Sequence, residues 1–198
     1  MEFNEKEISA LLDNLYLNED IKLKDIPDLD LYMDQIITLF DDKLNHLKRN
    51  NEEKIMTKTM INNYTKAKIL LPPIKKKYSK KHIILLALIY NLKQTLSIND
   101  IKYLFNDVLD NLDNLKDIEL EEIYQAFMNI KKLQADKLYT GLPEYIQIMQ
   151  DNTENFNYDN LNLSQMIIAV LALVNEANMK RRLAEKIIDN FFNKDSYR

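Results

Sequence analysis

Hydrophobic residues recur at helical spacing along most of the chain. In Leu31–Leu47 they fall at i, i+3, i+4 and i+7, which predicts a helix with one buried face. The segment Lys80–Gln94 is apolar nearly all round, so we expect it to be a helix at the buried centre of a domain. Ser164–Glu176 carries another wide apolar surface. The pattern predicts an all-α protein.

Polar residues mark where several of these helices begin. Thr57 is the predicted cap of a helix that runs to about Lys66, and Ser79 caps the apolar helix that follows. Ser97 and Asp100 have the spacing of a capping box.

Breaks in the pattern predict separate short helices in the second half of the chain. Gly141 is expected to end one helix and Pro143 to begin the next, which runs over Glu144–Gln150. Two final helices are expected over Ser164–Glu176 and Met179–Phe192.

Composition excludes several classes of site. The 198 residues include no Cys and one Gly, which excludes disulfides, thiolate metal sites and glycine-rich nucleotide loops. The apolar runs Ile83–Tyr90 and Met166–Val174 are shorter than the roughly 20 residues of a membrane span. No leader sequence is expected at the N-terminus. We expect a soluble cytoplasmic protein with no membrane contact.

Charge is distributed very unevenly. From Lys54 through Asn99 the chain has ten lysines and no acidic residue, whereas the remainder has 17 basic and 31 acidic residues. Lysines on a structural surface are usually accompanied by acids nearby in the sequence. A segment without them indicates a polyanionic partner, and we favour nucleic acid over a merely solvated surface.

The helix that follows Thr57 has two unlike faces. At about 100° per residue, one arc of about 140° gathers its amides, hydroxyl and amines. These are Lys58, Thr59, Asn62, Asn63 and Lys66. The opposite face carries Met60, Ile61 and Tyr64. Two consecutive Asn residues disfavour a helix, and they have two explanations: a turn, or contact with an adenine edge in the major groove.

No group of residues suggests catalysis. His46 and His82 have no companion at metal-ligand spacing, and we expect His82 on the surface or facing a phosphate. Acidic pairs such as Glu121 and Glu122 are expected to be solvated. We therefore expect no catalytic residue, no metal and no cofactor.

Four motifs resemble a known pattern. They are Thr57-x-x-x-Ile61-x-x-Tyr64, Leu70-Leu71-Pro72-Pro73, Tyr78-Ser79 and Leu96-Ser97-Ile98-x-x-Ile101-Lys102. They resemble the MerR-type winged helix-turn-helix. More closely, they resemble a family of bacterial proteins with a domain of unknown function, some of which are regarded as transcriptional repressors. The chain departs from the MerR pattern at Lys68 or Ile69, where that pattern has the wing glycine, and at Asn62 and Thr95.

The resemblance implies that Thr57–Lys66 is a recognition helix and that Ile69–Tyr78 is a wing. We expect an N-terminal helical extension over residues 1–26. A winged helix-turn-helix domain is expected over 27–106, and a helical domain for dimerisation or effector binding over 107–198.

These observations predict a sequence-specific DNA-binding protein that regulates transcription, and the resemblance implies that it acts as a repressor. The expected base contacts come from Thr59, Asn62 and Asn63. The expected phosphate contacts come from Lys58, Lys66, Lys75, Lys76, Lys77, Lys80 and Lys81. The expected partners are double-stranded DNA, a second copy of the chain and an unidentified effector in the C-terminal domain.

Two other functions remain open at this point. One is a non-specific DNA- or RNA-binding module, which would bind shuffled and cognate duplexes alike. The other is a helical adaptor that binds an acidic protein through its lysines.

Overall fold

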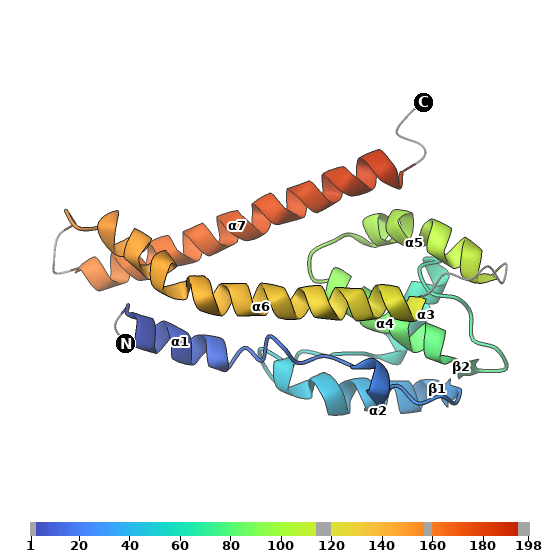
Figure 1. Ribbon diagram of the computed structural model, residues 1–198. Helices are drawn as coiled ribbons and strands as arrows, with labels where there is room; N and C mark the ends of the chain where they lie inside the picture. The colour runs from blue at the N-terminus through green and yellow to red at the C-terminus, as the bar shows by residue number, and fades with distance from the viewer. Residues whose placement is uncertain (1–2, 114–119, 157–159, 194–198) are drawn as a thin grey trace. The chain divides into compact units, whose positions relative to one another are not determined.

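A computed structural model describes residues 3–113, 120–156 and 160–193 (Figure 1). Within these ranges the chain forms seven α-helices, two short 3-10 helices and one two-stranded sheet. The elements are α1 (Glu5–Asp13), η1 (Leu23–Asp25), β1 (Leu31–Tyr32), α2 (Met33–Leu44), η2 (Asn45–Leu47), α3 (Lys58–Lys66), β2 (Lys77–Tyr78), α4 (Lys80–Leu92), α5 (Ile98–Asp113), α6 (Leu120–Asp151) and α7 (Leu161–Phe191). The prediction of a mostly helical protein is confirmed.

The chain divides into two compact units. The first unit combines Met1–Asn18 with Asn129–Arg182, and the second combines Glu19–Met128 with Leu183–Arg198. The second unit contains the whole of the lysine-rich segment. Each unit combines two separate segments of the chain, whereas the three domains predicted from the sequence are continuous. The division into three domains therefore stays a prediction.

Helix α4 is the centre of the second unit. All eight residues from His82 to Ile89 are buried. The core around them receives apolar side chains from α2, α3, α5 and the start of α6: Ile36, Phe40, Ile61, Tyr64, Ile101, Phe105 and Tyr124. The predicted buried helix is confirmed.

The two strands tie the segment before α2 to the segment before α4. Leu31 pairs with Tyr78 and Tyr32 with Lys77 in antiparallel register. The prediction that Leu31 begins a helix is therefore wrong, because Leu31 is buried in the sheet. Helix α2 begins at Met33, and Gln35 Oε1 accepts a hydrogen bond from the Tyr32 N–H at 2.8 Å.

In the first unit, α6 continues through the predicted break. Gly141 and Pro143 both lie inside this helix, so the predicted separate helices are wrong. Proline inside a helix costs about 3 kcal/mol. Here Leu142, Ile146 and Met149 offset this cost by packing in one apolar cluster on both sides of the proline.

Helix α7 is also longer than predicted. It runs unbroken from Leu161 to Phe191, so the prediction of two helices separated near Asn178 is wrong. By length and composition α7 could cross a membrane: it contains an 18-residue window of mean hydropathy 1.2, of which 11% is buried. One such helix is weak evidence for a membrane protein. The expectation of no membrane contact stays a prediction.

Truncation in α4 should destabilise the second unit strongly. Leu86 is fully buried, so Leu86→Ala should lower the free energy of unfolding by about 2–5 kcal/mol, measured by urea titration. Leu29 is 61% exposed, and Leu29→Ala is the control, with an expected change within about 0.5 kcal/mol. A loss below about 1 kcal/mol for Leu86→Ala would show that α4 does not hold the unit together.

Candidate nucleic-acid interface

Helix α3 presents the predicted polar face to solvent. Thr57 Oγ1 accepts a hydrogen bond from the Met60 N–H at 3.1 Å and caps the helix. Ile61 and Tyr64 are buried in the core and fix the rotation of the helix. The exposed residues are Lys58, Thr59, Asn62, Asn63 and Lys66. Asn62 and Asn63 lie within regular helix, which excludes the alternative that they form a turn.

The end of α3 uses a lysine where glycine is the usual residue. The Ile69 N–H donates to the Tyr64 carbonyl at 3.0 Å, and the Lys68 N–H donates to the Thr65 carbonyl at 3.1 Å. These are the bonds of a Schellman motif, which needs a left-handed residue. Lys68 has φ 59° and supplies it. A lysine thus meets a backbone requirement that glycine usually meets.

Lysines also form the tip of a hairpin between α3 and α4. Ile74 and Lys77 exchange two backbone hydrogen bonds of 3.0 and 2.9 Å. Between them, Lys75 and Lys76 have φ values of 50° and 64°, as in a type I′ turn. Such turns normally contain Asn-Gly, because a left-handed conformation costs other residues about 1 kcal/mol each. All three lysines from Lys75 to Lys77 are exposed.

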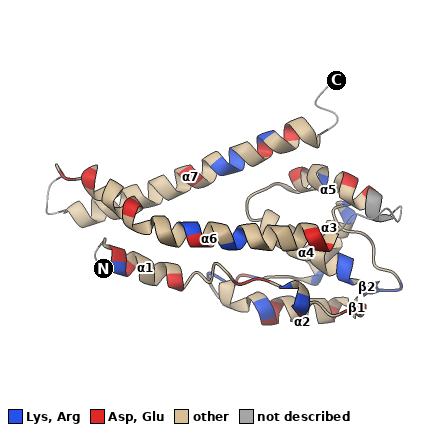
Figure 2. Cartoon of the chain, in the orientation of Figure 1, with Lys and Arg blue, Asp and Glu red and all other residues tan. Residues whose placement is uncertain are grey.

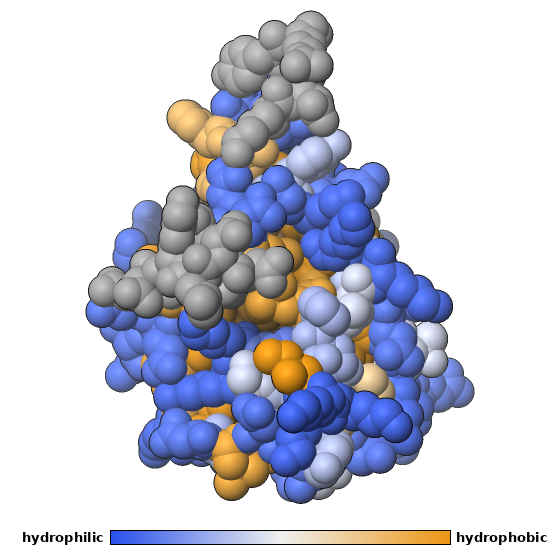
Figure 3. Space-filling view, turned by 90° about the vertical axis from the view of Figure 1, so that its right-hand side faces the viewer, coloured by the Kyte–Doolittle hydropathy of each residue, from blue (hydrophilic) through white to orange (hydrophobic). Residues whose placement is uncertain are grey.

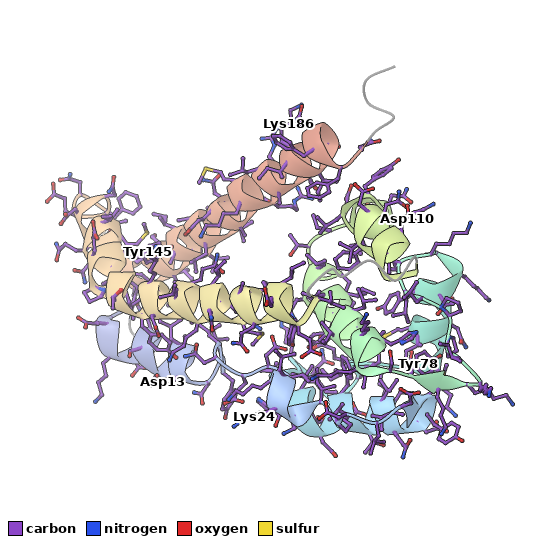
Figure 4. All side chains as sticks on the ribbon, turned by 45° about the vertical axis from the view of Figure 1, so that its right-hand side comes forward. Asp13, Lys24, Tyr78, Asp110, Tyr145 and Lys186 are labelled. Carbon is purple, nitrogen blue, oxygen red and sulfur yellow. The ribbon has the colours of Figure 1, made fainter. Side chains whose placement is uncertain are left out.

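A cavity of about 540 Å³ lies between α3 and this hairpin. Asn62 and Lys66 line it from α3, and Lys76 lines it from the hairpin. The remaining lining residues are Tyr32, Met33, Asp34, Thr65, Pro73 and Tyr78. Figure 4 labels Tyr78, which lies on β2 at the base of the hairpin. The cavity thus brings together side chains that the sequence assigned separately to base and phosphate contact.

Hydrophilic residues cover most of the side from which the hairpin projects, with small apolar areas among them (Figure 3). Lysines cluster on the hairpin and at the start of α4 (Figure 2). No sequence pattern predicted Tyr32 and Asp34 at the cavity, because the pairing of β1 with β2 brings this part of the chain there.

Two of the predicted phosphate-binding lysines have acidic partners. Lys58 Nζ lies 2.7 Å from Asp34 Oδ1. Lys80 Nζ lies 2.9 Å from Glu121 Oε2 and 3.3 Å from Asp28 Oδ1. The hydrogen bond with Glu121 is the largest of the contributions that raise the pKa of Lys80. The inference that the lysine segment has no compensating acid is wrong for these residues, because the acids come from other segments.

His82 is buried, so the prediction of a surface or phosphate-facing residue is wrong. Its Nδ1 accepts a hydrogen bond from the Ser79 N–H at 3.1 Å, so the neutral ring carries its proton on Nε2. That nitrogen donates to the Pro72 carbonyl at 3.3 Å. The ring also contacts Tyr78 edge to face, with centroids 5.6 Å apart. His82 therefore links the start of α4 to the hairpin.

The electrostatics of His82 favour this neutral form. Burial lowers its pKa and outweighs the hydrogen bond to Pro72 and the charge of Asp30, which both raise it.

The fold and this surface define a helical protein with a lysine-rich hairpin beside an exposed, amide-bearing helix. The chain belongs to the family described as "Domain of unknown function (DUF1836)", whose profile matches residues 21–127. This range nearly coincides with the Glu19–Met128 part of the second unit. The expected resemblance to a domain-of-unknown-function family is confirmed, and the MerR-type resemblance stays a prediction. Searches of curated proteins and of solved structures returned no match.

His82 should make stability depend on pH. Since its pKa is lowered in the folded state, the unfolded state binds a proton more readily below pH of about 6.5. Its contribution to stability is fully present above that pH and is lost as the pH falls. The parent should therefore lose stability relative to His82→Phe as the pH falls from 7.5 to 5, so that the difference between their unfolding free energies becomes smaller.

Urea titrations across this range provide the measurement. Leu29 is 61% exposed and carries no titratable group, so Leu29→Ala is the control, and its unfolding free energy should differ from that of the parent by a constant amount across this pH range. A constant difference for His82→Phe would mean that His82 titrates alike in the folded and unfolded states.

Proposed function

We propose that this protein is a sequence-specific DNA-binding transcriptional repressor. In this proposal residues 27–106 form a winged helix-turn-helix domain, with α2 and α3 as the helix-turn-helix and the lysine hairpin as the wing. The observation that carries it is the shared cavity: Asn62 and Lys66 of α3 and Lys76 of the hairpin line one hollow. The Asn62 amide, which can contact a base edge, thus lies beside two amines that can contact phosphates.

The dimensions of α3 suit the major groove. With its side chains this helix is about 10–12 Å across, and the major groove of B-DNA is about 12 Å wide. The buried face is used by the core, so only the polar face is available to DNA. Asn62 or Asn63 would make the two hydrogen bonds that an adenine edge offers, and Thr59 would contact a neighbouring base.

The lysines divide into two groups in this proposal. Lys66, Lys81 and the three hairpin lysines are exposed and would contact phosphates directly. Lys58 and Lys80 would do so only by giving up Asp34, or Glu121 and Asp28. Exchange at Lys58 is the easier of the two, because its ion pair is solvent-exposed and such pairs contribute at most about 1 kcal/mol.

Backbone strain at the hairpin tip also supports the proposal. Two adjacent lysines in left-handed conformation destabilise the fold where Asn-Gly would not. Strain of this kind is concentrated at functional sites. A requirement for positive charge at the tip explains why lysines occupy these positions.

Selection from random DNA tests the function. The purified full chain should enrich one sequence from a library of random duplexes at 150 mM salt. It should bind this sequence at least about 10³-fold more tightly than a shuffled duplex. Equal binding of all duplexes would favour the non-specific module. Binding to no nucleic acid, together with binding to polyglutamate, would favour the adaptor.

Truncation of Asn62 or Asn63 should reduce the sequence specificity of DNA binding without weakening non-specific binding. Asn62→Ala or Asn63→Ala should weaken binding to the enriched sequence by about 1–3 kcal/mol and leave binding to shuffled DNA unchanged. Stability should stay level or rise slightly, because Ala favours a helix more than Asn does. Titration of both duplexes at fixed salt, with melting curves, provides the measurement.

Asn99 is an exposed residue of α5, and Asn99→Ala is the matched control with no expected effect on either duplex. Equal losses on both duplexes would place Asn62 and Asn63 against the DNA backbone.

Relief of strain at the hairpin tip should stabilise the protein and weaken DNA binding. Lys75→Asn combined with Lys76→Gly should raise the unfolding free energy by about 1–2 kcal/mol, since both new residues favour the turn. A plot of log affinity against log salt should become less steep by about two units of slope, because two phosphate contacts are lost. Lys131→Gln with Lys132→Gln removes the same charge from α6 and should leave the slope unchanged. A stabilised double variant with an unchanged slope would remove the hairpin from the interface.

A further inference from the structure

Helix α7 has one face that packs within its own unit. On this face Gln165 and Ala169 are buried. The Tyr145 hydroxyl of α6 donates to the Ala169 carbonyl at 2.8 Å (Figure 4). The Gln165 amide donates to Thr153 Oγ1 at 3.0 Å, and Thr153 is itself fully buried. These bonds define the inward side of α7.

The opposite side carries a stripe of exposed apolar residues. The α7 stripe consists of Leu163, Ile167, Val170, Leu171 and Val174, with exposed fractions between 52% and 64%. Four of the five follow one another at intervals of four, three and four residues, which is the spacing of a coiled-coil seam. At about 100° per residue the stripe lies roughly opposite Gln165 and Ala169. It is therefore a second apolar face, distinct from the face that packs within the unit.

The spacing and the charges of α7 indicate what covers the stripe. The intervals four, three and four are the same in both directions, so two stripes match residue for residue in parallel or antiparallel pairing. No charged residue occurs from Leu161 to Asn175. Glu176 comes next and forms an ion pair with Lys180. The basic run Lys180–Arg182 begins with this lysine, and Arg181 continues the line of the stripe. A parallel pair would place each basic run beside its copy. An antiparallel pair centred between Ile167 and Val170 would separate the two Arg181 residues by about 37 Å along the axis.

A membrane fits this helix less well than a second copy does. The uncharged stretch of 15 residues is shorter than the roughly 20 that a membrane span requires. Moreover, if α7 spanned a membrane, the Gln165 amide would either lose its hydrogen bond to Thr153 and face hydrocarbon, or Thr153 would have to enter the membrane together with it.

We propose that the α7 stripe binds the α7 stripe of a second copy of this chain in antiparallel orientation. Leu163 of one copy lies against Val174 of the other, and Ile167 lies against Val170. The contact is two-fold symmetric, since each residue pair occurs twice. It requires no DNA and holds whether or not the protein regulates transcription.

Single cysteines test both the contact and its orientation, because the chain has no Cys of its own. In the antiparallel pair, position 163 lies about 16 Å along the axis from its copy, beyond the reach of a disulfide. Leu163→Cys alone and Val174→Cys alone should therefore form little cross-linked dimer on mild oxidation. The two variants co-expressed with different tags should form the mixed disulfide in high yield.

Controls separate a specific contact from collision. Leu133 is 60% exposed on α6, and Leu133→Cys should give only background cross-linking with either variant. Cross-linking of each variant to itself would show parallel pairing and overturn the proposed orientation. Background cross-linking in every combination would overturn the contact itself.

A charge substitution provides an independent measurement on the full-length protein. Val170→Glu should convert a dimer into a monomer in sedimentation at about 20 μM, with unchanged helix content by circular dichroism. Leu133→Glu is the matched control and should remain dimeric. A parent protein that sediments as a monomer and co-sediments with anionic phospholipid vesicles would overturn the proposal and identify a membrane surface as the partner.

Discussion

The second unit depends on the burial of α4. A helix that is apolar nearly all round has no side that water can solvate, so it must be enclosed on every side. Helices α2, α3 and α5 and the start of α6 provide this enclosure. The orientation of α3 follows, because Ile61 and Tyr64 are committed to the core and Asn62 and Asn63 must then face outward. His82 extends the constraint to the hairpin through its bond to Pro72. The proposed DNA-binding surface is thus the outer side of α3 and of the hairpin, which lie against the enclosed helix α4.

Local signals in the sequence predicted part of this arrangement. The Thr57 cap, the polar face of α3 and the Ser97–Asp100 capping box involve residues close in sequence, and all are present. Predictions failed where contacts between residues distant in the sequence determine the local structure. The strand at Leu31–Tyr32 exists only because β2 pairs with it, and α6 continues past Pro143 because of tertiary packing. Asp34 pairs with Lys58 and lines the cavity together with Tyr32, and Glu121 pairs with Lys80. These residues likewise come from segments outside the lysine-rich one.

Lysines occupy backbone positions where glycine is the usual choice. Lys68 ends α3, and Lys75 and Lys76 form the hairpin tip, all with positive φ. Of the three, Lys76 lines the cavity between α3 and the hairpin. A glycine at these places would relax the backbone but remove a positive charge. The conformational cost and the proposed electrostatic gain thus arise from the same side chains. Stability and polyanion binding are therefore expected to oppose each other at this surface.

The hydrogen bond from the Tyr124 hydroxyl to the Ile21 carbonyl has a consequence for folding during synthesis. It is 2.6 Å long, buried, and joins residues 103 positions apart. The segment before β1 can be secured only after the start of α6 has left the ribosome. Until then α4, which is made earlier, lacks part of its cover. Closing so long a loop is entropically unfavourable and slows folding. The nascent second unit is consequently expected to expose apolar surface to chaperones until Tyr124, nearly two thirds of the way along the chain, has left the ribosome.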